Sequence, residues 1–309
     1  MPKPPLPRIL VDNAADTVRG ILLVTLSYLM FTISDATAKW ALPVAGISGV
    51  MIWRGLFGTA SIVLIASATG TGWRRLVPVR WWLVLLRAGL SSGITFCWYY
   101  SWLTMSLVDT YAIGFSAPLI MIVLAVPLLG ERLAWRRTLS TVIGFAGVLL
   151  MLRPGGEIDI WTPALPVLAI GIFFLAFSRI LTRWLSTTET AESLAMTVLL
   201  SHCVTGIAIA LFHPPPGAFN GRIWLLMVLL GATSALAQVL NARSFALAPV
   251  SALAPYEYTG LIWAGLLGFA LFHEVPAWTT LIGAGIVIAA GLYNLHRERQ
   301  RRVAAVVGT

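Results

Sequence analysis

About ten apolar stretches of roughly 20 residues constrain the fold of this sequence more than any other feature. We place them at 20–41, 47–68, 81–104, 109–129, 135–153, 162–184, 188–212, 223–246, 251–273 and 277–296. Stretches of this length are long enough to cross the hydrocarbon core of a bilayer. Because such a segment must satisfy its own backbone hydrogen bonds, each is expected to be an α-helix. The sequence therefore predicts an all-α polytopic membrane protein with ten transmembrane helices.

The segments between these stretches are short and rich in turn-forming residues, so no soluble domain is expected. Composition agrees, since 58% of the residues are hydrophobic and only 11% are charged. The first stretch could resemble a signal peptide, but it is long and carries Asp35 and Lys39. We therefore expect it to be a retained helix.

The distribution of basic residues predicts how the helices are oriented. With the N-terminus in the cytoplasm, fifteen of the 21 Lys and Arg residues fall inside and three fall outside. Basic residues concentrate on the cytoplasmic side of membrane proteins. We expect a multi-pass inner-membrane protein with both termini cytoplasmic and the "HPPPGAFNG" connection outside. The basic tail "HRERQRR" is then expected to face anionic lipid. We therefore attribute the net charge of +9 to contact with the lipid bilayer, and we expect no nucleic-acid partner.

A weak internal repeat links the two halves of the chain. "GERLAW" at 130–135 and "HEVPAW" at 273–278 share a glutamate, an alanine and a tryptophan at an offset of 143 residues. Both segments close the fourth helix of a set of five, and we expect Glu131 and Glu274 to order the following turn. Because five is odd, the second set enters the membrane from the opposite side, as in many secondary transporters. We expect inverted repeats at 1–156 and 157–309.

These features resemble the drug/metabolite transporter superfamily, EamA type. The resemblance rests on the five-plus-five repeat, on the Glu-x-x-x-Trp segments, and on "PYEYTGLIWAGLLGFALFHE" at 255–274. Within the EamA type the sequence is most similar to YddG-type exporters of aromatic amino acids. The resemblance implies a secondary transporter that alternates access between two repeats and needs no cofactor. It leaves open other metabolites, such as a nucleoside, S-adenosylmethionine or a drug-like cation.

Glu257 is the most unusual residue of the ninth stretch, because a charge within a membrane segment faces the interior and marks a pathway or a pair. On a helical wheel it shares a face with small residues at 260, 264 and 268, and Tyr256 and Trp263 form an adjacent aromatic face. Glu257 either pairs with an arginine, Arg179 or Arg87, or binds the substrate or a proton. Protons are therefore one candidate coupling ion.

The first stretch carries a polar stripe, Tyr28, Thr32, Asp35 and Lys39, at helical spacing. Asp35 is expected to pair with Arg54 or with Lys39. An Arg54 left partly free would suit the carboxylate of an amino acid through a bidentate contact.

The third stretch contains "FCWYYSWLTM", with several polar aromatic residues deep in the membrane. The offset of 143 pairs Trp98 with Asn241, and an amide facing lipid is costly, so both are expected to face inward. Aromatic residues around a cavity favour aromatic or apolar solutes. The expected substrate site comprises Trp98, Tyr99, Trp102, Asn241, Tyr256, Glu257, Trp263, Arg54 and Asp35, with no catalytic or metal-binding residue.

Two other classes of function fit less well. A membrane-embedded enzyme needs a cluster such as two histidines and a carboxylate, and the four histidines are scattered. A channel needs a continuous polar lining. The sequence favours a secondary transporter that exports small amphipathic metabolites, with aromatic or other hydrophobic amino acids as the expected substrate. The alternative is export or import of another metabolite.

Overall fold

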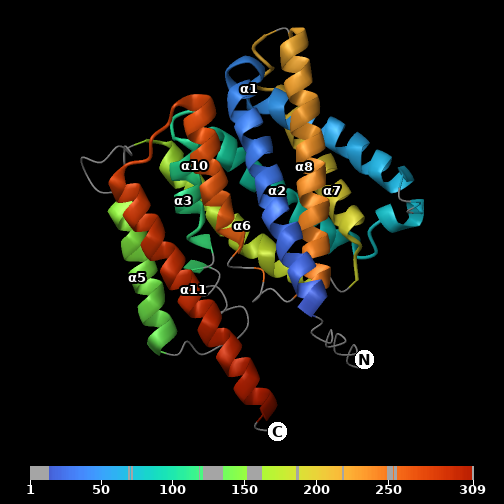
Figure 1. Ribbon diagram of the computed structural model, residues 1–309. Coiled ribbons are helices and arrows are strands. Elements are labelled where there is room, and N and C mark those ends of the chain that lie inside the picture. Colours follow the sequence, from blue (N-terminus) through green and yellow to red (C-terminus); the bar gives the residue numbers. More distant parts are fainter. Residues whose placement is uncertain are drawn as a thin grey trace.

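The computed structural model describes residues 14–68, 70, 72–117, 119–120, 135–151, 162–185, 188–217, 219–248, 253 and 256–307, and all secondary structure in these ranges is helical. Figure 1 shows the arrangement of the helices. Their bounds are α1 Ala14–Ala68, α2 Trp81–Ser101, α3 Leu107–Gly114, α5 Trp135–Met151, α6 Ala164–Leu185, α7 Ala191–Ala210, α8 Gly221–Leu247, α10 Thr259–Phe272 and α11 Trp278–Val307, with a short 3₁₀ helix at Trp73–Leu76. The segment 121–134, with the expected turn at Glu131, lies outside the described residues.

Helix α1 contains both of the first two predicted spans. Its backbone leaves the helical conformation at Gly46, where φ is 63° and ψ is 171°, and Pro43 lies just before this point. A positive φ is accessible to glycine at little cost. The chain therefore turns back at Gly46, and Figure 1 shows two separate blue helical segments that meet at one end of the bundle.

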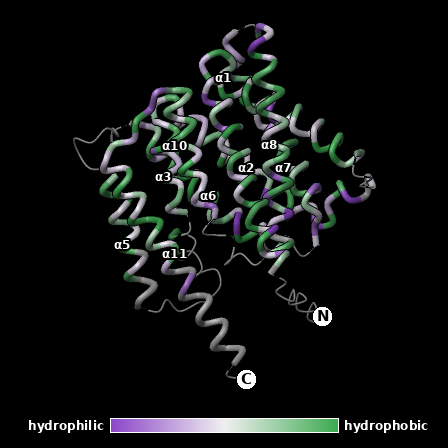
Figure 2. The backbone as a smooth tube through the Cα atoms, viewed as in Figure 1, coloured by the Kyte–Doolittle hydropathy of each residue, from purple (hydrophilic) through white to green (hydrophobic). Residues whose placement is uncertain are grey.

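The helices are apolar enough to cross a membrane. Four stretches reach spanning length and hydropathy among the described residues, namely Ala15–Ala68, Ala164–Thr182, Ala191–Ala210 and Gly221–Ser244. Shorter apolar helices lie at Val142–Met151, Thr259–Phe272 and Trp278–Tyr293. Large apolar side chains also face outward, such as Leu64 at 69% exposure and Leu225 at 69%, and Figure 2 shows hydrophobic residues along most of each helix. These properties support a multi-pass membrane protein.

Connections that the sequence places on one side of the membrane contact one another. On the expected outer side, the hydroxyl of Ser48 donates to the carbonyl of His213 over 2.8 Å. On the expected inner side, the carboxylate of Glu189 accepts the backbone N–H groups of Val79 and Arg80 at 2.9 and 2.7 Å. The start of α1 and the end of α11 also lie toward the same end of the bundle in Figure 1. This grouping agrees with the predicted alternation of the helices, while the side that faces the cytoplasm stays a prediction.

The second half of α1 crosses α7 with local two-fold symmetry. A Cβ atom built on Gly55 would lie 2.5 Å from the amide nitrogen of Cys203 and 2.5 Å from the carbonyl oxygen of Leu199. A Cβ atom built on Gly206 would lie 2.7 Å from the nitrogen of Ile52 and 2.9 Å from the oxygen of Ser48. Each glycine thus meets the backbone three and seven residues before the other glycine. Small residues permit such close approach of membrane helices.

We predict that Gly55→Ala lowers thermal stability in detergent, because the new methyl group overlaps the backbone of α7, and overpacking of this kind costs about 1–3 kcal/mol. Gly89→Ala in α2 is the matched control, since a Cβ atom there meets nothing within 4 Å. The melting temperature should fall for Gly55→Ala and stay within about 2 °C of the wild type for Gly89→Ala. Equal melting of the two variants would contradict the tight crossing.

Candidate functional site

The polar stripe of α1, predicted as Tyr28, Thr32, Asp35 and Lys39, faces the interior of the bundle. Tyr28, Asp35 and Lys39 each contact a different group of charged or polar residues. From Tyr28 to Lys39 the helix rises about 16 Å, since each residue adds about 1.5 Å. The stripe therefore carries three polar clusters at successive depths, which we term the inner, middle and outer clusters.

The inner cluster joins Glu257, Arg179 and Tyr28. A guanidinium nitrogen of Arg179 lies 2.8 Å from Oε2 of Glu257, and the hydroxyl of Tyr28 donates to the same oxygen over 2.9 Å. Arg179 also donates to the oxygen of Tyr28 over 3.2 Å. The expected pairing of Glu257 with an arginine is confirmed, with Arg179 as the arginine. Arg87, the other candidate, instead donates to Thr182 over 2.7 Å.

The small-residue face of α10 explains why Tyr28 comes so close. Gly260, Ala264 and Gly268 are all buried, as the helical wheel predicted. A Cβ atom at Gly260 would lie 2.8 Å from Cδ1 of Tyr28 and 3.3 Å from Cε1 of Tyr111. Glycine at 260 therefore leaves room for two tyrosine rings between α1 and α10.

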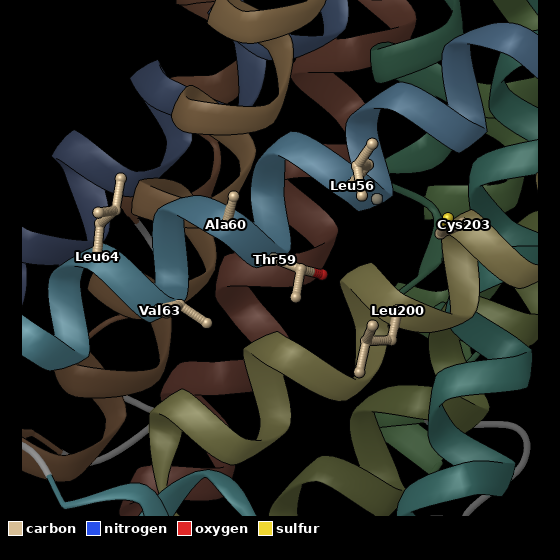
Figure 3. A pocket seen from close by; sticks show the side chains of 8 residues that line it. Leu56, Thr59, Ala60, Val63, Leu64, Leu200 and Cys203 are labelled. Carbon is tan, nitrogen blue, oxygen red and sulfur yellow. The ribbon is translucent and has the colours of Figure 1, made fainter.

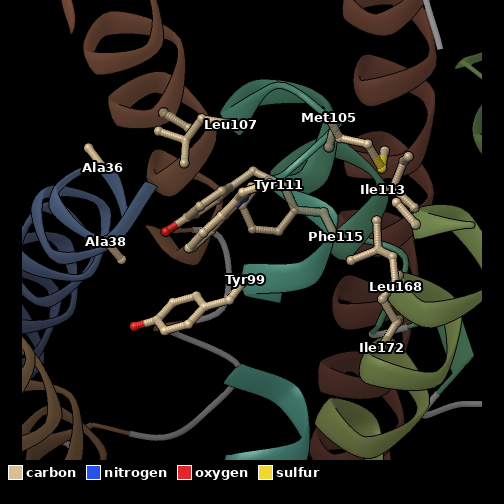
Figure 4. Close-up of a cluster of buried hydrophobic side chains, with 14 of the residues drawn as sticks. Ala36, Ala38, Tyr99, Met105, Leu107, Tyr111, Ile113, Phe115, Leu168 and Ile172 are labelled. Atoms are coloured by element: carbon tan, nitrogen blue, oxygen red, sulfur yellow. The ribbon is translucent and has the colours of Figure 1, made fainter. Parts of the chain in front are cut away.

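The middle cluster surrounds Asp35. Tyr111 donates to Oδ2 of Asp35 over 2.7 Å, and Nη1 of Arg54 lies 3.5 Å from Oδ1. The same Nη1 donates to the hydroxyl of Tyr99 over 2.7 Å. Figure 4 shows both tyrosine hydroxyls directed toward the α1 segment that carries Ala36 and Ala38. Of the two predicted partners of Asp35, the structure selects Arg54.

The outer cluster uses Lys39, the other predicted candidate. Its ammonium group pairs with Oε1 of Glu274 and donates to the carbonyl of Met105 over 2.9 Å. Oε2 of Glu274 accepts the N–H of Leu107, the first residue of α3, over 2.9 Å. Glu274, expected only to order its turn, thus connects α1, α3 and the end of α10.

Of the aromatic residues predicted at the end of α2, Tyr99 and Trp102 are buried and Trp98 is partly buried. A Cβ atom on Gly114 or on Gly171 would lie 3.0 Å from the indole ring of Trp98, so this ring is wedged between α3 and α6. Tyr99 is fully buried and Trp102 is 4% exposed, and their ring centroids are 5.5 Å apart. The expectation that this face of α2 points inward agrees with these contacts.

The predicted residues of the second half are more dispersed. Asn241 donates to Ser27 of α1 over 3.4 Å, which agrees with an inward orientation. The indole Nε1 of Trp263 is buried without a hydrogen-bond partner among the described residues. Tyr256 is 38% exposed, whereas Tyr258, which the sequence did not select, is 8% exposed. Both tyrosines precede α10, which begins at Thr259, so the helical wheel of α10 does not place them.

Residues that the predicted site omitted include Tyr28, Arg179, Tyr111, Tyr258, Lys39 and Glu274, although several were noted as neighbours or partners. Tyr111 has the largest role among them, because it joins Asp35 to the glycine face of α10. Its signal in the sequence is weak, since a tyrosine in an apolar stretch also suits the membrane interface.

Two cavities open on the surface of the described structure. The first, about 460 Å³, lies between the second half of α1 and α7 and is lined mostly by aliphatic side chains. Figure 3 shows Leu56, Ala60, Val63 and Leu64 along one side of it and Leu200 and Cys203 along the other. The second, about 300 Å³, lies beside the outer cluster and is lined by Lys39, Trp40, Leu42, Pro43, Trp102, Leu103 and Phe272. Of the predicted site residues, only Trp102 lines either cavity.

The buried charges and the helical bundle agree with the result of comparisons with known proteins. Residues 18–153 match the EamA-like transporter family. This match agrees with the resemblance of the sequence to the EamA type. A solved crystal structure is similar with a TM-score of 0.65 and 15% identity, and the similarity covers 94% of this chain and 99% of the solved chain. At this identity the likeness shows the fold alone.

Curated proteins that are similar to this chain are named as transporters. The S-adenosylmethionine uptake transporter of Rickettsia bellii (strain RML369-C) is 28% identical over 79% of this chain and 82% of its own. The riboflavin transporter of Brucella anthropi is 25% identical over 85% of this chain and 94% of its own. These names fit the expected alternative, transport of another metabolite, better than export of aromatic amino acids.

We predict that Glu257→Gln destabilises the protein, because glutamine cannot neutralise Arg179. Removing one partner of a fully buried pair costs about 3–5 kcal/mol. Since the side chain of Arg179 is 31% exposed, we expect about 1–3 kcal/mol. Glu192→Gln is the matched control, because Glu192 pairs over 3.0 Å with Arg243, which is 45% exposed. Exposed pairs contribute about 0–1 kcal/mol. Thermal melting that ranks Glu192→Gln as the more damaging change would contradict the assignment.

Proposed function

We propose that this protein is a secondary transporter that moves a bulky amphipathic metabolite with a heteroaromatic ring across the cell membrane. S-adenosylmethionine and riboflavin represent this substrate class. The match of residues 18–153 to EamA-like transporters and the names of the relatives support this proposal. It replaces aromatic amino acids, our expectation from the sequence, as the first substrate class to test.

The observation that carries the proposal is the polar stripe of α1. Charged and polar side chains inside a membrane bundle mark solute pathways or structural pairs. Here the stripe places Glu257, Asp35 and Glu274 in three clusters at successive depths. Tyr28, Tyr99, Tyr111 and Trp102 lie in or beside these clusters. Aromatic rings beside charges suit a solute with both a ring and charged groups.

For the mechanism we propose alternating access between inverted repeats of five helices each, residues 1–156 and 157–309. The symmetric crossing of α1 and α7 at Gly55 and Gly206 supports a two-fold relation between the halves. The outer cluster also joins the halves, since Lys39 belongs to the first and Glu274 to the second. Opening of the protein toward the side of the outer cluster then requires Lys39 and Glu274 to separate, while the contacts at the opposite side remain in place.

Counterflow into liposomes containing the purified protein tests the proposal. Liposomes preloaded with unlabelled solute should accumulate labelled S-adenosylmethionine or riboflavin faster than protein-free liposomes, because a carrier exchanges solute across the membrane. Glu192→Gln is the control variant and should exchange at the wild-type rate, since Glu192 lies at a helix end outside the three clusters. Labelled tryptophan is the third solute tested, and exchange of tryptophan alone would restore aromatic amino acids as the substrate class. Absence of exchange for all three solutes would reject the transporter.

A further inference from the structure

Arg54 is a buried cation whose hydrogen bonds are incomplete. The residue is 5% exposed. Its Nη1 donates to Tyr99 and faces Asp35, but its Nε is buried without a partner among the described residues. A buried donor that lacks an acceptor carries a desolvation cost, so native structures nearly always supply one. The Nε side of this guanidinium is therefore a position where an acceptor is missing.

A second unpaired donor belongs to a residue that packs on Tyr99. Trp102 is 4% exposed, and its indole Nε1 also has no partner in the described part of the chain. Tyr99 connects the two, because its hydroxyl contacts Arg54 at 2.7 Å and its ring centroid lies 5.5 Å from that of Trp102. Two buried N–H donors thus flank one tyrosine.

Asp35 neutralises Arg54 only loosely. The distance from Nη1 to Oδ1 is 3.5 Å, at the limit of a hydrogen bond, whereas Tyr111 holds the other carboxylate oxygen at 2.7 Å. A charge-assisted hydrogen bond is ordinarily about 2.7–2.9 Å long. Asp35 therefore balances the charge without occupying the Nε side of Arg54, where a second carboxylate could bind.

We propose that Arg54, with Trp102 beside it, receives the carboxylate of the transported substrate. The inference rests on the proposed function and narrows its substrate class to a metabolite with a free carboxylate. S-adenosylmethionine has an amino-acid carboxylate and riboflavin has none, so the inference favours the first. A side-on arginine contact uses Nε and Nη2 for two parallel hydrogen bonds to one carboxylate.

The second cavity reaches Trp102, the residue of the second unpaired donor. Trp102 lines this cavity together with Lys39 and Phe272, and Trp102 also packs on Tyr99. The ammonium group of Lys39 lies 5.2 Å from the ring centroid of Phe272. An anionic group in the cavity thus lies beside Lys39 and Trp102, and Trp102 packs on Tyr99, which contacts Arg54.

A pair of probes that differ only in the carboxylate tests the inference. In the counterflow assay, unlabelled S-adenosylmethionine and its decarboxylated analogue compete with labelled S-adenosylmethionine. Loss of a hydrogen-bonded charge pair weakens binding about tenfold or more. We expect the analogue to compete at least about tenfold more weakly with the wild type. Arg54→Lys keeps the positive charge but removes the paired N–H donors of the guanidinium. This variant should discriminate between the two competitors by about threefold or less.

Arg87→Lys is the matched control, because Arg87 is another arginine of the membrane helices and contacts Thr182 and the Leu194 carbonyl instead. It should keep the discrimination of the wild type. Equal competition by both probes, or undiminished discrimination in Arg54→Lys, would overturn the inference. Exchange of riboflavin without S-adenosylmethionine would overturn it while leaving the proposed function in place. Absence of exchange for both S-adenosylmethionine and riboflavin would reject both the inference and the proposed function.

Discussion

A charge inside hydrocarbon must be paired, and the arrangement of helices around α1 follows from this requirement. Removing a carboxylate from water costs several kcal/mol unless partners compensate. Glu257 finds Arg179 and Tyr28, Asp35 finds Arg54 and Tyr111, and Glu274 finds Lys39. These partners come from α1, α3 and α6. The ion pair of Lys39 with Glu274 and the hydrogen bonds of Tyr28 and Tyr111 thus hold α1 against the elements that surround it.

The spacing of polar residues on α1 made part of this site predictable. Tyr28, Asp35 and Lys39 follow helical periodicity in an apolar stretch, so their common face could be inferred without coordinates. The arginine partner of Glu257 was predictable as one of two, because depth in the membrane restricts the choice. The selection of Arg179 over Arg87 depends on how α6 packs, and packing between distant helices has no local signal.

Other parts of the site could not be predicted from periodicity. The predicted site included Tyr256, which is 38% exposed, and left out Tyr258, which is 8% exposed. Both precede α10, which begins at Thr259, so the periodicity of that helix does not place them. The capping of α3 by Glu274 joins residues 167 positions apart, which no local pattern encodes. The turn inside α1 was better specified, since a proline and a glycine separate two apolar runs.

Close glycine packing and buried ion pairs have different roles in this account. The crossing at Gly55 and Gly206 is rigid and symmetric, because backbone meets backbone. An ion pair between long side chains can separate and re-form when solvent or a ligand replaces the partner. In the proposed mechanism the crossing stays fixed while the halves move and the polar contacts open in turn.

A charge exchange between Lys39 and Glu274 tests most directly the claim that paired charges join α1 to the second half. Thermal melting and counterflow are measured for Lys39→Glu, for Glu274→Lys and for the double variant. Each single change places two like charges together and should lower the melting temperature and the exchange rate. The double variant restores an opposite pair and should recover a large part of both losses, with a coupling energy of about 0.5–3 kcal/mol. A double variant as impaired as the two single changes combined would contradict the account.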